Sequence, residues 1–243
     1  MNLEQLLEGL RASSAFMQHV THWETLPARP ARLSPFPEGI DARIPAALHA
    51  RGVQALYTHQ RQAADALARG EHIVVVTPTA SGKTLCYNLP VLQSILENPD
   101  NRALYLFPTK ALSADQAHEL YTLIEQMEVP VKAYTYDGDT PATARRSIRQ
   151  AGHVVITNPD MLHAAILPGH TKWVKLFENL RYIVIDEIHA YRGVFGSNLA
   201  NVIRRLKRLC AFYGSHPQFI CCSATIHNPA ELAAQMTGET ITL

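Results

Sequence analysis

The chain has 243 residues, of which 47% are hydrophobic and 18% are charged, and its formal net charge is +1 at pH 7. This is the composition of a globular protein with enough length for a full core, and it does not mark the whole chain as a nucleic-acid binder. Any contact with nucleic acid must therefore come from a local patch. With no run of about eighteen apolar residues and no signal-peptide centre, the sequence predicts a cytoplasmic protein, or a nuclear one if eukaryotic, with no membrane partner.

The four cysteines show no C-x-x-C spacing, which argues against a zinc site and a disulfide framework. We therefore expect them to be small buried apolar side chains in a reducing compartment.

The first 45 residues are expected to form an accessory segment. Leucines at helical spacing predict an amphipathic helix within residues 1–20. Residues 27–45 hold five of the fifteen prolines, so they should form an extended arm rather than regular helix or central strand. Residues 46–243 are then the catalytic domain, and its first helix is predicted over residues 58–68.

Residues 72–89 read HIVVVTPTASGKTLCYNL and predict a buried strand, a tight loop and a helix. This is the context of a phosphate-binding loop, in which backbone N–H groups and the helix N-terminus form an anion site. Lys83 should reach the β and γ phosphates, and the Thr84 hydroxyl should ligate Mg²⁺. The full motif has glycine where this chain has Thr77, so an ordinary turn with an exposed lysine is the alternative. The nucleotide-binding candidates are Thr79, Ala80, Ser81, Gly82, Lys83 and Thr84.

Strand and helix patterns alternate through the rest of the chain, which predicts an α/β fold with a parallel sheet flanked by helices. Right-handed crossovers place every loop that follows a strand at one edge of that sheet. The expected strands are 103–107, 131–136, 153–157, 182–186, 219–223 and 241–243, and the expected helices are 112–127, 141–150 and 197–213.

Two adjacent carboxylates, Asp186 and Glu187, end the strand pattern at residues 182–185. Because open α/β sheets bind ligands at the carboxyl ends of their strands, Asp186 is placed to hold Mg²⁺ through water. Glu187 would orient and deprotonate the attacking water. Taken alone, the pair could also be an acidic helix start.

These motifs together resemble those of the superfamily-two helicases. Asp186-Glu187-Ile188-His189 resembles the DExH box, which adds His189 to the catalytic candidates, and Ser223-Ala224-Thr225 resembles the third motif, which couples phosphate loss to lobe movement. Residues 52–60, GVQALYTHQ, resemble the adenine-reading Q motif, although Val53 and Leu56 stand where DEAD-box members have Phe and Pro. The stretches LYTHQ, TPTASGKT, YDGDT, TNPDML and AYRGVFGSN look closest to DNA-repair helicases of the mitomycin-repair type.

The resemblance implies a RecA-like domain that binds ATP and Mg²⁺ and tracks single-stranded or partly duplex DNA. The Gln60 amide would pair with adenine N6 and N7. Lys110 is the one cation among the residues expected to contact nucleic acid, so binding should depend only modestly on salt. Turn chemistry is the alternative for this set. Its members are Pro108, Thr109, Lys110, Gly138, Asp139, Thr157 and Asn158.

The predicted function is the ATP-binding lobe of an ATP-dependent DNA helicase. An RNA helicase is one alternative, and a kinase-like P-loop module that does not act on nucleic acid is another. The third-motif resemblance disfavours the kinase-like module. After this motif too few residues remain for a second RecA-like lobe of ~150 residues. We therefore expect a missing second lobe of the same polypeptide to be the main partner and the isolated lobe to be nearly inactive.

Overall fold

The computed structural model describes residues 2–25, 30–78 and 81–243. The chain forms two compact units, Met1–Arg32 and Leu33–Leu243. Residues 33–45, which the sequence assigned to the accessory segment, therefore lie in the second unit. Strand β1 (Leu33–Ser34) pairs antiparallel with strand β2 (Leu56–Tyr57), and this ribbon ties the proline-rich arm to the start of helix α4 (Thr58–Ala68).

The described residues of the N-terminal unit form two short helices in place of the single predicted one. Helix α1 (Leu3–Ala12) opens with a capping box in which Asn2 and Gln5 each accept the other's backbone N–H. Ser13 ends α1, and its hydroxyl accepts the Phe16 N–H at 3.3 Å to begin helix α2 (Ser14–Met17). Serine caps a helix strongly, so the chain restarts at this position.

The second unit is built on a seven-stranded sheet in which every neighbouring pair of strands is parallel. The strand order is β5-β6-β4-β7-β8-β3-β9. The predicted α/β class with a parallel sheet is confirmed, and each predicted strand is present with ends shifted by at most two residues. The strands are β3 (His72–Val76), β4 (Arg102–Leu106), β5 (Ala133–Thr135), β6 (Val154–Thr157), β7 (Leu180–Ile185), β8 (Gln218–Ser223) and β9 (Ile241–Thr242).

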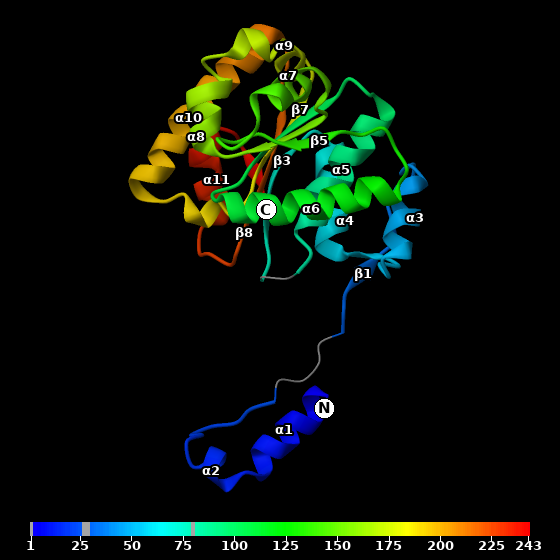
Figure 1. Cartoon of the computed structure of the whole chain (residues 1–243), viewed down its shortest axis with the longest axis vertical. Helices are drawn as coiled ribbons and strands as arrows, with labels where there is room; N and C mark the ends of the chain where they lie inside the picture. The colour runs from blue at the N-terminus through cyan, green and yellow to red at the C-terminus, as the bar shows by residue number, and fades with distance from the viewer. Residues whose placement is uncertain (1, 26–29, 79–80) are drawn as a thin grey trace. The chain divides into compact units, whose positions relative to one another are not determined.

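The sheet is covered by helices on both faces, because successive side chains of a buried strand point to opposite sides. In β4, Tyr105 belongs to the core beneath α3–α6, whereas Leu104 belongs to the core beneath α7–α11. Figure 1 shows α4 and α5 on one side of the sheet and α10 and α11 on the other. The longer helices are α5 (Thr84–Glu97), α6 (Lys110–Gln126), α7 (Ala142–Ala151), α10 (Gly193–Tyr213) and α11 (Pro229–Thr237).

Several short helices were not predicted. Helix α3 (Arg43–Ala50) begins in the stretch expected to be extended, and it tolerates Pro45 because a first-turn residue needs no N–H partner. The others lie between β6 and β7 and bury Trp173 and Phe177 in the core. They are α8 (Pro159–Met161), the π-helix Leu162–Ile166, the 3₁₀ turn His170–Lys172 and α9 (Val174–Glu178).

Among the described residues, no helix has the length and apolar character needed to cross a bilayer. The four cysteines are free and buried, as predicted. No group of three or more His, Cys, Asp or Glu side chains in the described part of the chain is arranged to hold a metal ion.

Candidate functional site

The order of the strands sorts the predicted residues into two neighbouring sets. The phosphate-binding loop follows β3, the Asp-Glu pair follows β7 and Ser223 ends β8, and these three strands are adjacent. The residues expected to contact nucleic acid follow β4, β6 and β5, which form the other part of the sheet. The ends of parallel strands with right-handed crossovers meet at one edge, so both sets lie along the same edge.

The phosphate-binding loop is closed by its own polar atoms. Lys83 Nζ donates to the Thr77 carbonyl at 3.1 Å, and the hydroxyls of Thr77 and Ser81 are 2.5 Å apart. Gly82 adopts a left-handed backbone with φ +78°, which suits glycine. The contact with the Thr77 carbonyl holds the Lys83 ammonium group close to the loop that is expected to bind the nucleotide phosphates. Thr79 and Ala80, also predicted here, lie outside the described residues.

Gln60 locks the loop to helix α4. Its Oε1 accepts the Tyr57 N–H at 2.9 Å, and its Nε2 donates to the Gly82 carbonyl at 2.8 Å. The side chain is 3% exposed. A primary amide has a second N–H and a second oxygen lone pair, so adenine pairing stays a proposal for this residue.

A chain of hydrogen bonds connects the two predicted magnesium ligands. Thr84 Oγ1 donates to Gln116 Oε1 at 2.8 Å, and the Tyr87 hydroxyl donates to the same oxygen at 3.0 Å. The Tyr87 hydroxyl also lies 3.4 Å from Asp186 Oδ2. Because Thr84 gives its proton to Gln116, its oxygen lone pairs remain available to a cation. A buried carboxylate and a hydroxyl oxygen are the donors that a hard cation prefers, so this set fits Mg²⁺.

Asp186 is buried at the end of β7, and burial is the main reason that its pKa rises from 3.8 to about 6. The Glu187 N–H, which donates to Asp186 Oδ1 at 2.8 Å, opposes that rise, and so do Lys83 and Tyr87. The charge of Glu187 adds to it. A buried carboxylate whose anionic form is disfavoured is one that a bound cation would stabilise.

The Glu187 backbone is left-handed, with φ 50° and ψ 47°, an uncommon conformation for a residue with a side chain. Its Oε2 lies 3.0 Å from His189 Nδ1. The same ring nitrogen is 3.5 Å from Ser223 Oγ and 3.3 Å from the Ala224 N–H. The structure therefore brings the DExH residues and the start of the third motif together. Thr225 is exposed and has no hydrogen-bond partner among the described residues.

The predicted nucleic-acid residues divide by exposure. Lys110 begins α6 and forms an ion pair of 2.6 Å with Asp139, while Thr109 caps that helix by accepting the Leu112 N–H at 3.3 Å. Pro108 is half-buried, whereas Gly138 and Asp139 are exposed. Asn158 Oδ1 caps α8 by accepting the Met161 N–H at 2.9 Å.

The structure gives Thr157 a different role from the predicted one. It is 2% exposed, and its hydroxyl donates to the Tyr136 carbonyl at 2.6 Å. A side chain that is buried and paired in this way joins β6 to the loop after β5 and cannot reach a phosphate. We therefore leave Thr157 out of the nucleic-acid surface.

Three polar residues of this region were missed by the sequence reasoning. Tyr87 lies three residues after Thr84 and so on the same face of α5, a spacing that could have indicated it. Gln116 and Arg145 gave no such signal. They reach the Mg²⁺ candidates and the loop after β5 from helices that are distant in sequence.

Residues 57–232 match the family model for the DEAD/DEAH box helicases. The chain belongs to the DEAD/DEAH box helicase family. The helicase family predicted from the motifs is thereby confirmed, and family membership removes the kinase-like alternative.

Known members of the family resemble the whole chain. It is 60% identical over 242 residues to the ATP-dependent helicase YprA of Bacillus subtilis, covering 100% of this chain and 32% of that protein. It is 37% identical over 245 residues to the ATP-dependent helicase hrq1 of Schizosaccharomyces pombe, covering 98% and 23%. A crystal structure of the DUF1998 helicase MrfA bound to DNA and AMPPNP matches with a TM-score of 0.91 at 60% identity, over 100% of this chain and 34% of that one. The chain thus spans about a third or less of these relatives.

Proposed function

We propose that this chain is the ATP-binding lobe of an ATP-dependent DNA helicase of a DNA-repair branch, which couples ATP hydrolysis to movement along a single strand. The observation that carries the proposal is the meeting of Glu187, Ser223 and Ala224 at His189 Nδ1. A neutral ring nitrogen that accepts the Ala224 N–H cannot also donate to Glu187. The His189 ring can therefore form a hydrogen bond with Glu187 or with Ala224, but not with both at once. A switch between these two partners would couple the DExH box to the third motif.

In the nucleotide site, Lys83 would exchange the Thr77 carbonyl for the β and γ phosphates and neutralise them. Thr84 and Asp186 would hold Mg²⁺, and the cation would supply positive charge that offsets the charge of the phosphates. Glu187 would accept a proton from the attacking water. Tyr87 and Gln116 lie between the two candidate ligands, with the Tyr87 hydroxyl 3.0 Å from Gln116 Oε1 and 3.4 Å from Asp186 Oδ2.

Two features support DNA as the nucleic acid. The 60% identical MrfA structure contains DNA, and a 27% identical structure of the Mycobacterium smegmatis helicase Lhr contains ssDNA and AMP-PNP. On this chain the surface would consist of Pro108, Thr109, Lys110, Gly138 and Asn158. All of these except Pro108 have a backbone N–H, and the short polar side chains of Thr109 and Asn158 also suit phosphate oxygens. RNA binding is an outcome that the test below separates from DNA binding. The cytoplasmic localisation predicted from the sequence stays a prediction.

A second RecA-like lobe of the same polypeptide is the proposed partner. Such a lobe would supply arginines to the γ-phosphate, and arginine fingers contribute roughly 10³–10⁵ in rate. We therefore expect residues 1–243 to turn over ATP very slowly and without stimulation by DNA. Brisk hydrolysis that rises with added DNA would contradict this part of the proposal.

The nucleotide site is tested by titrating residues 1–243 with a fluorescent ATP analogue and Mg²⁺. Lys83→Ala should weaken binding by about 10- to 100-fold, since a charge-assisted contact is lost. Lys172→Ala, which removes an exposed lysine elsewhere, is the matched control and should bind as the wild type does. Equal affinity of Lys83→Ala and wild type would refute the site.

The catalytic assignment needs a second comparison. Glu187→Gln keeps the shape of the side chain and loses the base, so it should bind the analogue normally and lower whatever single-turnover hydrolysis the wild type shows. Labelled oligo-dT and oligo-rU are then titrated in parallel. Preference for oligo-rU would replace the DNA proposal by the RNA one, and binding of neither would refute the nucleic-acid surface.

A further inference from the structure

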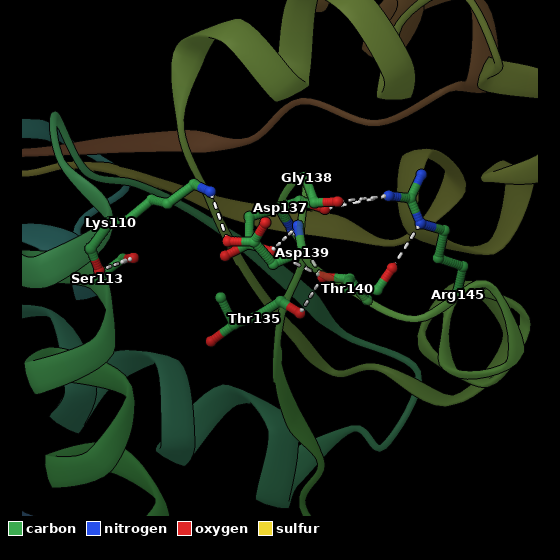
Figure 2. A network of polar contacts seen from close by, with 8 residues as sticks. All are labelled: Lys110, Ser113, Thr135, Asp137, Gly138, Asp139, Thr140 and Arg145. Atoms are coloured by element: carbon green, nitrogen blue, oxygen red, sulfur yellow. Dashed lines mark hydrogen bonds and ion pairs between the residues drawn. The ribbon is translucent and has the colours of Figure 1, made fainter.

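Lys110, the cation of the proposed DNA surface, already forms an ion pair with a carboxylate of the same chain. Lys110 Nζ lies 2.6 Å from Asp139 Oδ2, and the two side chains come from segments that follow β4 and β5. Both are accessible, with 55% of the Lys110 side chain and 81% of the Asp139 side chain exposed. Figure 2 shows Lys110 reaching across to the loop that carries Asp139. A strand passing over this edge would therefore meet an ion pair in place of a free ammonium group.

The loop that carries Asp139 is held in place by its own contacts. The Asp139 N–H donates to Asp137 Oδ1 at 2.9 Å, and the Thr140 hydroxyl lies 3.2 Å from that oxygen. From the opposite side, Arg145 donates to the carbonyls of Thr140 at 3.0 Å, Asp137 at 3.2 Å and Gly138 at 3.4 Å (Figure 2). Asp139 thus faces Lys110 from a braced turn rather than from a free loop.

The backbone of the turn also offers one hydrogen-bond donor that a phosphate could use. Arg145 takes the carbonyl oxygens, and the Asp137 N–H donates to Thr140 Oγ1 at 2.9 Å. The Gly138 N–H has no hydrogen-bond partner within the described ranges. An N–H donor in the residue before Asp139 suits a phosphate oxygen, whereas the Asp139 carboxylate repels one.

We propose that Asp139 is an intramolecular stand-in for a DNA phosphate, holding Lys110 until a strand displaces it. The inference rests on the nucleic-acid surface proposed above and changes the role of Asp139 from contact to competitor. A carboxylate and a phosphate cannot both occupy the ammonium group at close range without bringing two anions together. Binding therefore requires that Lys110 exchange one partner for the other.

The competition sets the expected size of the effect. Exposed ion pairs of this kind form with equilibrium constants of about 1.4 to 5, which corresponds to their measured stabilities. Asp139 should therefore lower the affinity for a single strand by about two- to sixfold, and its removal should restore that factor.

The salt dependence gives a signature that a purely structural residue would not produce. When the wild type binds DNA, the phosphate that contacts Lys110 loses a counterion, while the freed Asp139 carboxylate gains one. Little net counterion release therefore accompanies this contact. Without the carboxylate the full release is recovered. The slope of log affinity against log salt should then steepen by up to about 0.7, the value for one single-strand phosphate.

The test uses residues 1–243 and a labelled oligo-dT of about 12 nucleotides, titrated by fluorescence anisotropy between about 50 and 200 mM salt. Asp139→Asn keeps the size of the side chain and Asp139→Ala removes it. Lys110→Gln and the double variant with Asp139→Asn complete a cycle. Glu119→Gln is the matched control, because it changes net charge equally and frees Arg51 from an exposed ion pair elsewhere on α6.

The expected result is tighter binding and a steeper salt slope for both Asp139 variants, no change for Glu119→Gln, and no gain when Lys110→Gln is present. If the wild type binds and Asp139→Asn changes neither the affinity nor the salt slope, the stand-in role is overturned. The proposed DNA surface is then retained. A gain that persists in the Lys110→Gln background also overturns it, since the effect would then be general repulsion. Failure of wild type and Asp139 variants alike to bind refutes the surface and the inference together.

Discussion

The Tyr87 hydroxyl offers a sharp test of whether the buried network affects the proposed binding of Mg²⁺ and nucleotide. Tyr87 is 1% exposed, and its hydroxyl lies 3.0 Å from Gln116 Oε1 and 3.4 Å from Asp186 Oδ2. Tyr87→Phe removes this donor and leaves the ring in the core. We expect a loss of about 1–2 kcal/mol of stability, because the one hydroxyl proton shared between Gln116 Oε1 and Asp186 Oδ2 is lost inside the core. For a chain of this size the melting temperature should fall by about 2–8 °C.

The same change should act on Asp186. The Tyr87 hydroxyl lowers the pKa of Asp186, which burial raises to about 6, so the pKa should rise further in Tyr87→Phe. A contact of 3.4 Å is long, and we expect about 0.5–1 kcal/mol, which equals roughly 0.4–0.7 pH units. Because Mg²⁺ needs the carboxylate, binding of Mg²⁺ with a fluorescent ATP analogue should weaken as pH falls through about 6, and the midpoint should lie higher in the variant.

A second buried tyrosine provides the control. Tyr105 is also 1% exposed, packs against Tyr87 with ring centroids 5.2 Å apart, and donates to Asn88 Oδ1 at 3.0 Å rather than to Asp186. Tyr105→Phe should lose similar stability and keep the wild-type pH midpoint. The nucleotide's own phosphate titrates in this range, so the comparison is made between variants. Equal midpoints for Tyr87→Phe and Tyr105→Phe would refute the proposed link to Asp186.

Three further changes have expected outcomes. Asp186→Asn should stabilise the nucleotide-free chain at pH 7 by up to about 3 kcal/mol. The pKa of Asp186 is raised from 3.8 to about 6 in the folded chain, so the carboxylate makes stability fall as pH rises between those values, and the amide removes this loss. An unchanged melting temperature would contradict this. His153 has its pKa lowered to about 4 by burial and Arg102, so stability should fall by about 1–2 kcal/mol as pH drops from 6.5 towards 4. His153→Asn keeps an acceptor for the Lys132 N–H and should flatten that slope in pH-dependent melts. Gly82→Ala should cost about 2–3 kcal/mol in urea unfolding, since the φ of Gly82 is +78° and an added Cβ would lie 2.7 Å from Gln60 Nε2. In a Gln60→Ala background this loss should be smaller, and a loss of the same size would argue against the clash.

Local patterns in the sequence determined the elements and the candidate residues of the proposed nucleotide site. The helix predicted over residues 58–68 is helix α4 with the same bounds, and the apolar runs became strands of one parallel sheet. Lys83, Thr84 and Asp186 could be proposed from the sequence because the roles expected of them depend on a strand and on the residues that directly follow it. Such information lies within a few residues of sequence.

Tertiary structure alone decided which residues meet. The strand order places Ser223 between the phosphate-binding loop and the Asp-Glu pair, and this brings it to His189. The burial of Thr157 and the ion pair between Lys110 and Asp139 depend on β5, β6 and β4 lying side by side. Pairing between strands and packing of distant helices are set by the whole core, so a turn residue and a phosphate contact look alike in the sequence. They differ only once the fold has determined which partner each one has.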